Sequence, residues 1–314
     1  MEYIGIDVSK EKLDFAFMEW KHKVFSNSEW GIQQAIIWIE ENVRMKEIQN
    51  TDIHIVVEST SWYHWLACIM LRNENFQVHL INPLITKKYQ KSSIRDAKSD
   101  KVDAYRLAQI WKFESNLPLF FDSHESLGRK RQQSLLAKLE RVKQELSQSL
   151  HDAMKSLEFI GISLDLSSLQ HALDAIVLAI QTLKKMIENQ ADDFAKKLAQ
   201  TPWISLFQAS TLALAVSWRT FSSREKVVAF FGLDVRARQS WTWRWNSYIS
   251  KRGNPYLRKI LFQIGWSLKQ HHPRFKKHYQ KLRDDGKHYY TAILSTARKF
   301  LAYFFKLFLE FSYN

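Results

Sequence analysis

Four carboxylates are spaced as if to hold divalent metal ions: Asp7, Glu58, Asp100 and Asp103. Asp7 lies in a short apolar run near the start of the chain, and Glu58 ends a second such run. Asp100 and Asp103 are three residues apart at the start of a predicted helix, so they share one face of it. Mg²⁺ and Mn²⁺ prefer hard oxygen ligands, which carboxylates supply. The four acids therefore predict a magnesium- or manganese-dependent site for phosphodiester chemistry.

The helical pair has a simpler alternative reading. Acids in the first turn of a helix cap its amides and compensate its dipole, so Asp100 and Asp103 could serve only the helix. The surrounding basic residues favour the functional reading, because they could guide a phosphate backbone towards the pair. These residues are Lys87, Lys88, Lys91, Arg95, Lys98, Lys101 and Arg106, of which we predict Lys98 and Lys101 to bind nucleic acid.

Ser250 is a second candidate for chemistry, within the segment Ile249–Asn254. A serine next to Lys, Arg and Gly is common on protein surfaces, and a plain surface position is the alternative. The functional reading is a nucleophile for phosphoryl transfer, which needs a base or a metal ion to activate its hydroxyl. No His–Asp pair is obvious near Ser250. This indicates activation by the metal of the four acids, supplied across a domain or subunit boundary.

The first 115 residues have the pattern of an α/β domain. Apolar and aromatic residues in rough alternation predict three consecutive strands at 2–8, 12–19 and 22–26. Helices and strands then alternate, with helices at 28–44, 61–73, 83–91 and 101–113 and strands at 52–58 and 76–81. Three strands followed by such alternation are typical of an RNase H-like domain, which places strand-borne and helix-borne acids together.

The remaining chain is predicted to be helical. Leucines recur at helical spacing on both sides of Gly161, which predicts an antiparallel helical hairpin or coiled coil for spacing or dimerisation. The alternative is a helical bundle packed on the first domain. Residues 200–314 are predicted to be mostly helical, with a loop from Val235 to Pro255. The expected fold is thus α/β plus α, with domains at 1–115, 116–199 and 200–314.

The charge of the chain points to a polyanionic partner. Net charge is +14, and the stretch from Arg219 to Lys287 alone holds 17 Lys and Arg against 4 Asp and Glu. A solvated basic face is the alternative.

The single cysteine, Cys68, excludes a disulfide within the chain, and we expect it in the core. No apolar run reaches the roughly 18 residues of a membrane span, and no signal peptide is visible, so we expect a cytoplasmic protein without a membrane partner.

Several motifs together carry a family resemblance. In the first part of the chain they are Gly5–Lys10 with Leu13-Asp14, Glu58–Thr60 with Tyr63-His64, Asn82-Pro83, and Lys98–Ala104 with Leu107-Ala108. In the last part they are Phe230–Asp234, Gln239-Ser240, and Ile249–Asn254 with Leu257-Arg258. In this order, over nearly the whole chain, they resemble the DEDD transposases of insertion-sequence family one hundred and ten, with Piv-type DNA invertases as relatives.

The resemblance implies a RuvC-like domain, a coiled coil and a transposase domain. It implies that Asp7, Glu58, Asp100 and Asp103 hold Mg²⁺, and that Ser250 attacks DNA to form a covalent phosphoserine. It further implies a bridge RNA that pairs with target and donor DNA, and a dimer or tetramer in which the RuvC-like site of one protomer meets the serine of another. We would place such a protein at the bacterial nucleoid. Expected nucleic-acid contacts near the serine are Arg244, Lys251, Arg252, Asn254 and Arg258.

Two other functions remain open. One is a RuvC-like metal-dependent nuclease or junction resolvase, in which Ser250 only contacts the backbone. The other is a domesticated or decayed nucleic-acid-binding protein that does not cut. Loss of covalent DNA adducts in Ser250→Ala would separate the recombinase from a hydrolytic nuclease, which would continue to cut.

Glycine is scarce and tryptophan abundant, at 8 and 12 residues. Five tryptophans stand where the resembling family tends to have glycine, and we hypothesise that they are UGA codons that the organism reads as glycine. The alternative is that these side chains stack on unpaired bases. UGG codons at these positions would contradict recoding. The five are Trp203, Trp218, Trp241, Trp243 and Trp245.

Overall fold

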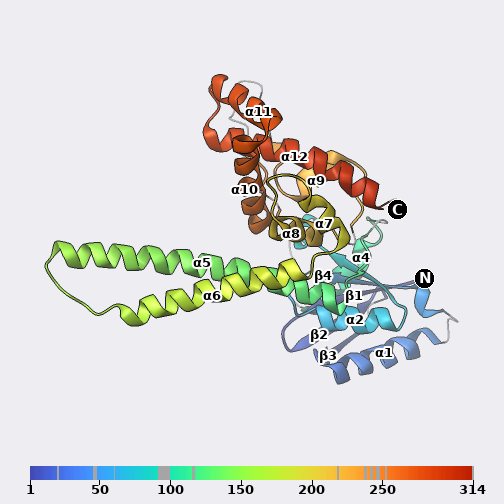
Figure 1. Ribbon diagram of the computed structural model, residues 1–314. Helices are drawn as coiled ribbons and strands as arrows, with labels where there is room; N and C mark the ends of the chain where they lie inside the picture. Colours follow the sequence, from blue (N-terminus) through green and yellow to red (C-terminus); the bar gives the residue numbers. More distant parts are fainter. Residues whose placement is uncertain are drawn as a thin grey trace. The chain divides into compact units, whose positions relative to one another are not determined.

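The chain folds into two compact units, Met1–Leu127 and Gly128–Asn314 (Figure 1). The computed structural model describes residues 1–19, 21–44, 48–59, 61–90, 100–114, 117–217, 219–236, 239–240, 243–244, 248–251 and 253–312. The division into three domains stays a prediction. Among the described residues, no helix combines the length and apolar character needed to cross a membrane.

The first unit is built on a five-stranded sheet in the order β3-β2-β1-β4-β5. Its strands are β1 (Glu2–Val8), β2 (Lys12–Phe17), β3 (His22–Ser26), β4 (Ile53–Glu58) and β5 (Gln77–Ile81). The first three strands pair antiparallel, whereas β4 pairs parallel with both β1 and β5. Consecutive residues of β1, β2 and β4 are buried, so these strands have both sides covered, and the predicted α/β fold is confirmed.

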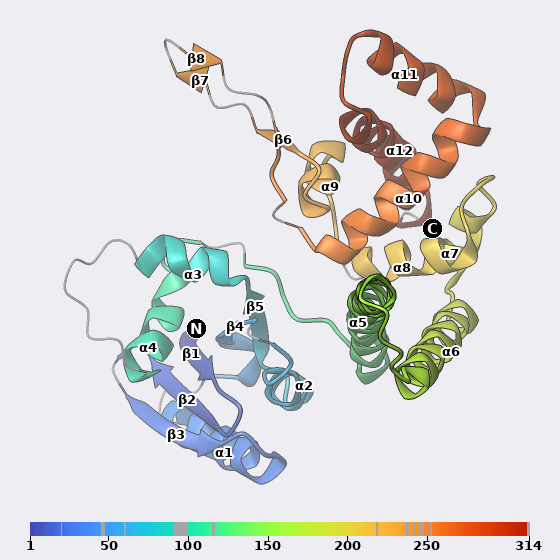
Figure 2. The same ribbon diagram turned by 90° about the vertical axis from the view of Figure 1, so that its left-hand side faces the viewer.

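Helices cover both faces of this sheet (Figure 2). The larger core packs α1 (Glu29–Val43) and α2 (Trp65–Asn73), with the buried Cys68, against one face. The opposite face carries α4 (Asp100–Ile110) and a smaller cluster with Val56, Leu107 and Ile110. Two shorter elements in the described part of this unit are the 3₁₀ turn η2 (Asn50–Asp52) and α3 (Pro83–Gln90).

Gly5 allows α4 to lie directly on β1. A Cβ atom at this position would collide with the carbonyl oxygen of Ala104 and lie 2.5 Å from the backbone nitrogen of Ala108. Both obstacles are backbone atoms, which cannot turn aside as the end of a flexible side chain can. The absence of a side chain at Gly5 therefore sets the distance between the helix and the strand.

The second unit is helical. Its long helices α5 (His124–Phe159, which begins in the first unit) and α6 (Ser167–Asn189) run side by side as a hairpin (Figures 1 and 2). The predicted second stretch, Leu169–Leu198, is two helices, because Asp192 caps a new one. The remaining helices are α7 (Asp193–Ala199), α8 (Leu206–Val216), α9 (Arg224–Phe230), α10 (Pro255–His271), α11 (Pro273–Asp284) and α12 (Tyr289–Ser312).

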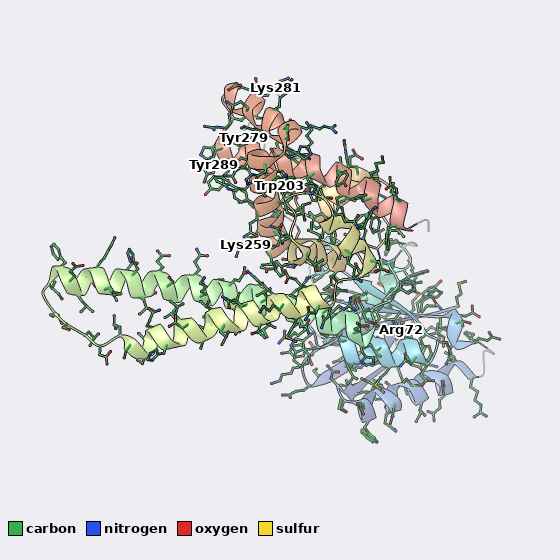
Figure 3. The ribbon with its side chains drawn as sticks, viewed as in Figure 1. Arg72, Trp203, Lys259, Tyr279, Lys281 and Tyr289 are labelled. Carbon is green, nitrogen blue, oxygen red and sulfur yellow. The ribbon has the colours of Figure 1, made fainter. Side chains whose placement is uncertain are left out.

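A shared core and one charged cluster join the hairpin to these helices. Leu136 of α5 and Ile180 of α6 belong to the same buried cluster as the apolar faces of α8, α10 and α12. Beside it, Glu140 accepts hydrogen bonds from Lys184 at 2.8 Å and Lys259 at 2.6 Å (Lys259 is labelled in Figure 3). Burial opposes ionisation of Glu140, but the two lysines prevail and lower its pKa.

The predicted loop from Val235 to Pro255 contains short strands, so this prediction was incomplete. β6 (Val235–Arg236) pairs antiparallel with β9 (Tyr248–Ile249), and β7 (Gln239–Ser240) pairs antiparallel with β8 (Trp243–Arg244). Strands of two residues are too short to show an alternating pattern. Their pairing depends on contacts across the ladder, which the local sequence does not display.

Gly5→Ala is expected to destabilise the protein by at least about 3 kcal/mol, because a methyl group cannot fit between β1 and α4. Urea denaturation measures the change. Gly128→Ala is the matched control. Nothing lies within 4 Å of a Cβ at this exposed position in α5, so alanine should stabilise the helix by up to about 1 kcal/mol. Equal stability of Gly5→Ala and the parent would contradict the proposed close packing.

Candidate active site

The sheet brings Asp7 and Glu58 to the same edge. β1 and β4 are parallel neighbours with Ile6 opposite Val57, and each acid follows directly after this pair. The ends of adjacent parallel strands meet at one edge of a sheet, which is where α/β folds build their sites. Two acids 51 positions apart in the sequence therefore become neighbours.

The start of α4 adds Asp100 and Asp103, and the charges of all these acids act on Asp7. Burial is the largest cause of a raised pKa at Asp7, and neighbouring negative charges add to it, so the pKa reaches about 6. The contributing carboxylates, in decreasing order, are Asp100, Asp103, Asp14 and Glu58. The structure therefore brings the other three sequence-predicted acids near enough to Asp7 for their charges to act on it.

Three of the four acids are engaged by other side chains. Lys12 Nζ lies 2.5 Å from Asp100 Oδ2, and Arg106 Nη1 lies 3.1 Å from Asp103 Oδ1. The Thr86 hydroxyl donates a hydrogen bond to Glu58 Oε2. As these side chains stand, no three His, Cys, Asp or Glu residues in the described ranges form a ready metal-binding group.

The donor set nevertheless fits a hard divalent cation. It consists of carboxylate oxygens only, and burial, followed by repulsion from the neighbouring carboxylates, raises the pKa of Asp7. A bound cation would relieve this repulsion and favour the ionised form of each acid. Asp7, Glu58, Asp100 and Asp103 are the residues that would hold it.

Asp14 is a fifth acid of this group that we did not predict as a site residue. It lies directly opposite Asp7 across β1 and β2, so both side chains leave the same face of the sheet. Asp14 is only 4% exposed and lies 2.9 Å from His22 Nε2, with Lys12 Nζ at 3.4 Å. The sequence does contain a signal for Asp14. A tight turn between two predicted strands makes them pair antiparallel, and this pairing places Asp14 opposite Asp7.

Ser250 lies in the second unit, directly after β9. Its backbone N–H donates to the carbonyl oxygen of Asp234 at 2.9 Å, and its hydroxyl donates to the carboxylate of the same residue. The next residue, Lys251, has a φ of 54°, in the left-handed region that non-glycine residues rarely adopt. The serine is thus held at a sharp turn beside an acid, Asp234, that sequence reasoning did not connect with it.

The other residues predicted to contact nucleic acid differ in their exposure and in the contacts that they make. Lys101 and Lys251 are exposed. Asn254 caps α10 by accepting a hydrogen bond from the Tyr256 N–H at 2.8 Å. The Arg258 guanidinium donates to the carbonyl oxygen of Gly253, so both residues shape the turn after Ser250. Outside the described residues lie Lys98 and Arg252, and for Arg244 only the backbone is described.

Trp203 has a backbone conformation that favours glycine. Its φ is 74°, between α7 and α8, while its half-exposed ring stacks on His271 with centroids 4.5 Å apart (labelled in Figure 3). A side chain in this region costs about 1–2 kcal/mol relative to glycine. The geometry at Trp203 supports the recoding hypothesis for this position. Trp218, Trp241 and Trp245 lie outside the described residues, as does the side chain of Trp243.

Asp7→Asn should stabilise the metal-free protein while removing a metal ligand. With a folded-state pKa of about 6, ionised Asp7 is penalised only in the folded state, and neutral asparagine avoids this penalty. Solvent screening of the half-buried group reduces the gain to about 1 kcal/mol. The gain should be complete at pH 7.5 and shrink as the pH falls towards 4, where aspartic acid is neutral too. Urea titrations in EDTA measure it, with exposed Asp285→Asn as the control, and a less stable Asp7→Asn at pH 7.5 would contradict the prediction.

Trp203→Gly should be more stable than Trp203→Ala by about 1–2 kcal/mol, because both lose the ring but only alanine keeps the strained backbone. Trp266 is the matched control, as an exposed tryptophan inside α10. There the order should reverse, since glycine weakens a helix by about 1 kcal/mol relative to alanine. Thermal unfolding of the four variants measures their stabilities. The same order of the glycine and alanine variants at both positions would contradict the assignment of backbone strain to Trp203.

Two family models match separate parts of the chain. A DEDD transposase model of the IS110 family, described as "Transposase", matches residues 4–156, which contain the four acids. A second model, described as "Transposase IS116/IS110/IS902 family", matches residues 195–280, which contain Ser250. The curated proteins contain no match to the chain. The two matches follow the order of the two units, and the chain belongs to the IS110 family of DEDD transposases.

Proposed function

We propose that this transposase cuts and exchanges DNA strands through a covalent bond between Ser250 and DNA, in a metal-dependent reaction directed by a bridge RNA. Family membership supports the general activity, a DNA transposase or recombinase. The observation that carries the metal dependence is the gathering of Glu58, Asp100 and Asp103 around Asp7. Such an acid cluster is suited to phosphodiester chemistry.

The four acids and Ser250 have different roles in this proposal. A divalent ion, Mg²⁺ or Mn²⁺, would supply a Lewis acid that neutralises charge on the scissile phosphate. Asp7 and its neighbours hold that ion by their carboxylates, and Ser250 attacks the phosphorus atom through its hydroxyl oxygen. The covalent phosphoserine conserves the energy of the broken bond, so that strands can be rejoined without hydrolysis of a nucleotide.

Base pairing of a bridge RNA with target and donor DNA would choose the sites. The protein then needs to bind backbone and shape rather than base sequence, as in other RNA-guided systems. The 17 Lys and Arg between Arg219 and Lys287 suit this task, since phosphate contacts are made by basic side chains. We further propose that protomers assemble as dimers or tetramers at the bacterial nucleoid, where acids and serine from different protomers act on one strand.

Ser250→Ala should abolish covalent protein–DNA adducts. The full-length protein is purified with its RNA, that RNA is sequenced, and DNA duplexes matching its loops are used as substrates. Parent protein should form adducts in Mg²⁺ and not in EDTA, and Asp7→Ala should reduce them at least about 100-fold. Exposed Ser149→Ala in α5 is the matched control and should react like the parent.

The same experiment separates the other functions. Strand cleavage without adducts, unchanged in Ser250→Ala, would identify a hydrolytic nuclease or resolvase. DNA binding without any Mg²⁺-dependent cleavage in the parent would identify a decayed transposase. Absence of any co-purifying RNA with paired DNA targets would exclude RNA guidance while leaving the serine chemistry intact.

A further inference from the structure

A basic pocket lies beside the candidate nucleophile in the second unit. It has a volume of about 490 Å³ and is open to solvent. Its wall includes Asp234, the carboxylate that accepts the hydrogen bond from the Ser250 hydroxyl. The wall also carries the cations Arg224, Arg298 and Lys299, the titratable His278, and a second acid, Glu225, whose Oε1 lies 3.0 Å from Arg224 Nη2.

The strand ladder explains why Asp234 and Ser250 meet. β6 and β9 pair Val235 with Ile249, and one residue further along, Asp234 stands opposite Ser250. Side chains directly opposite each other in an antiparallel pair project from the same face, with Cβ atoms about 5 Å apart. Residues 16 positions apart therefore form a hydroxyl–carboxylate pair whose position is set by backbone hydrogen bonds.

The cationic wall is carried by helices. Ser295, Arg298 and Lys299 occupy one face of α12 at spacings of three and four residues, Arg224 starts α9, and His278 lies on α11. Burial lowers the pKa of Arg298, so the fold holds this cation where water solvates it poorly. Within the described part of the chain, no carboxylate lies within ion-pair distance of Arg298. Because the guanidinium of Arg298 is poorly solvated, binding of an anionic ligand beside it would be favourable.

The positive charges near the pocket also affect the pKa of His278. Burial first, then the positive charges of Lys299, Arg298 and Lys281, lower its pKa. Its Nε2 lies 3.3 Å from the Ser295 hydroxyl, so it is occupied within the wall. Asp234 thus contacts the serine hydroxyl, and Arg298 and Lys299 line the same pocket.

We propose that this pocket binds the scissile phosphodiester, with Asp234 as the proton acceptor of Ser250 and Arg298 as the cation that stabilises the charged phosphoryl oxygens. This inference rests on the proposed serine chemistry and adds two residues to it. A divalent metal ion and Asp234 would have separate roles. The metal ion would neutralise charge on the phosphate, whereas the serine hydroxyl still needs a base to take its proton.

The step balances without a further reactant. The Ser250 oxygen forms a bond to phosphorus while the bond from phosphorus to one sugar oxygen breaks. The hydroxyl proton moves to a carboxylate oxygen of Asp234, and the leaving sugar oxygen takes up a proton from solvent to become a hydroxyl. When the strand is rejoined, protonated Asp234 can return its proton to the serine oxygen.

A phosphorylating probe tests this pocket independently of DNA and RNA. A dialkyl fluorophosphate transfers its phosphoryl group to an activated serine and releases fluoride, and peptide mass spectrometry locates the modified residue. We expect the full-length protein to be labelled at Ser250. Asp234→Asn should lower the labelling rate about 10²-fold or more, and Arg298→Gln about 10-fold or more. Asp234→Glu and Arg298→Lys should each recover part of the rate, which excludes misfolding as the cause.

Matched controls come from the same helical unit. Asp285→Asn and Arg141→Gln make the same chemical changes at exposed positions and should be labelled like the parent. No labelling of Ser250 in the parent, or equal rates in parent and Asp234→Asn, would overturn the role of Asp234. Equal rates in parent and Arg298→Gln would overturn the role of Arg298.

The DNA adduct assay separates failure of this inference from failure of the proposed function. If Ser250→Ala loses adducts while Asp234→Asn keeps the parental rate, the serine mechanism stands and the inference is wrong. If both lose adducts while DNA binding is unchanged in gel shifts, the inference is supported. If Ser250→Ala retains adducts, the serine mechanism is wrong, and the inference falls with it.

Discussion

The close approach of α4 to β1 at Gly5 is the constraint on which the first unit depends. Backbone atoms of Ala104 and Ala108 occupy the space of a side chain at Gly5. Asp103 directly precedes Ala104, so this contact determines how near the helix-borne acids come to the edge of the sheet. The acids on the strands would be present without it, but they would lack half of the donor set.

Gathering these acids has an electrostatic cost, which the structure offsets only in part. Lys12 neutralises Asp100, Arg106 pairs with Asp103, and His22 contacts the buried Asp14. At Asp7 the remaining cost is visible as a pKa raised to about 6 by burial and by the neighbouring carboxylates. Functional sites often keep such destabilising groups, and here a positively charged ligand would compensate the repulsion between the carboxylates.

The second unit presents a contrasting environment. Around Ser250, Asp234 lies in a pocket whose wall carries three cations and one further acid, Glu225, whereas around Asp7 several acids meet few cations. An acid-rich centre suits metal ions and a cation-rich centre suits phosphate, so the two centres divide the requirements of phosphodiester exchange. The turn that carries the serine is held by the cap at Asn254 and by Arg258, which binds the carbonyl oxygen of Gly253.

Much of the fold was predictable from local pattern. The strands and helices of the first unit match the alternation and helical spacing of their apolar residues, and both periods are visible within a dozen positions. The long helices α5 and α6 followed in the same way from recurring leucines. Pairs of two-residue strands, such as β6 and β9, could not be predicted, because so short a segment carries no period.

By itself, the sequence determined which residue types were available: four acids at strand ends and a helix start, one serine in a basic segment, and the family motifs around them. Tertiary structure alone decided which of them meet. Asp14 became a neighbour of Asp7, and Asp234 a neighbour of Ser250, through antiparallel register. Arg298 reached the pocket from a helix that begins about 40 residues after the serine. Register and helix packing arise from contacts between distant segments, and such contacts leave no mark in the spacing of neighbouring residues.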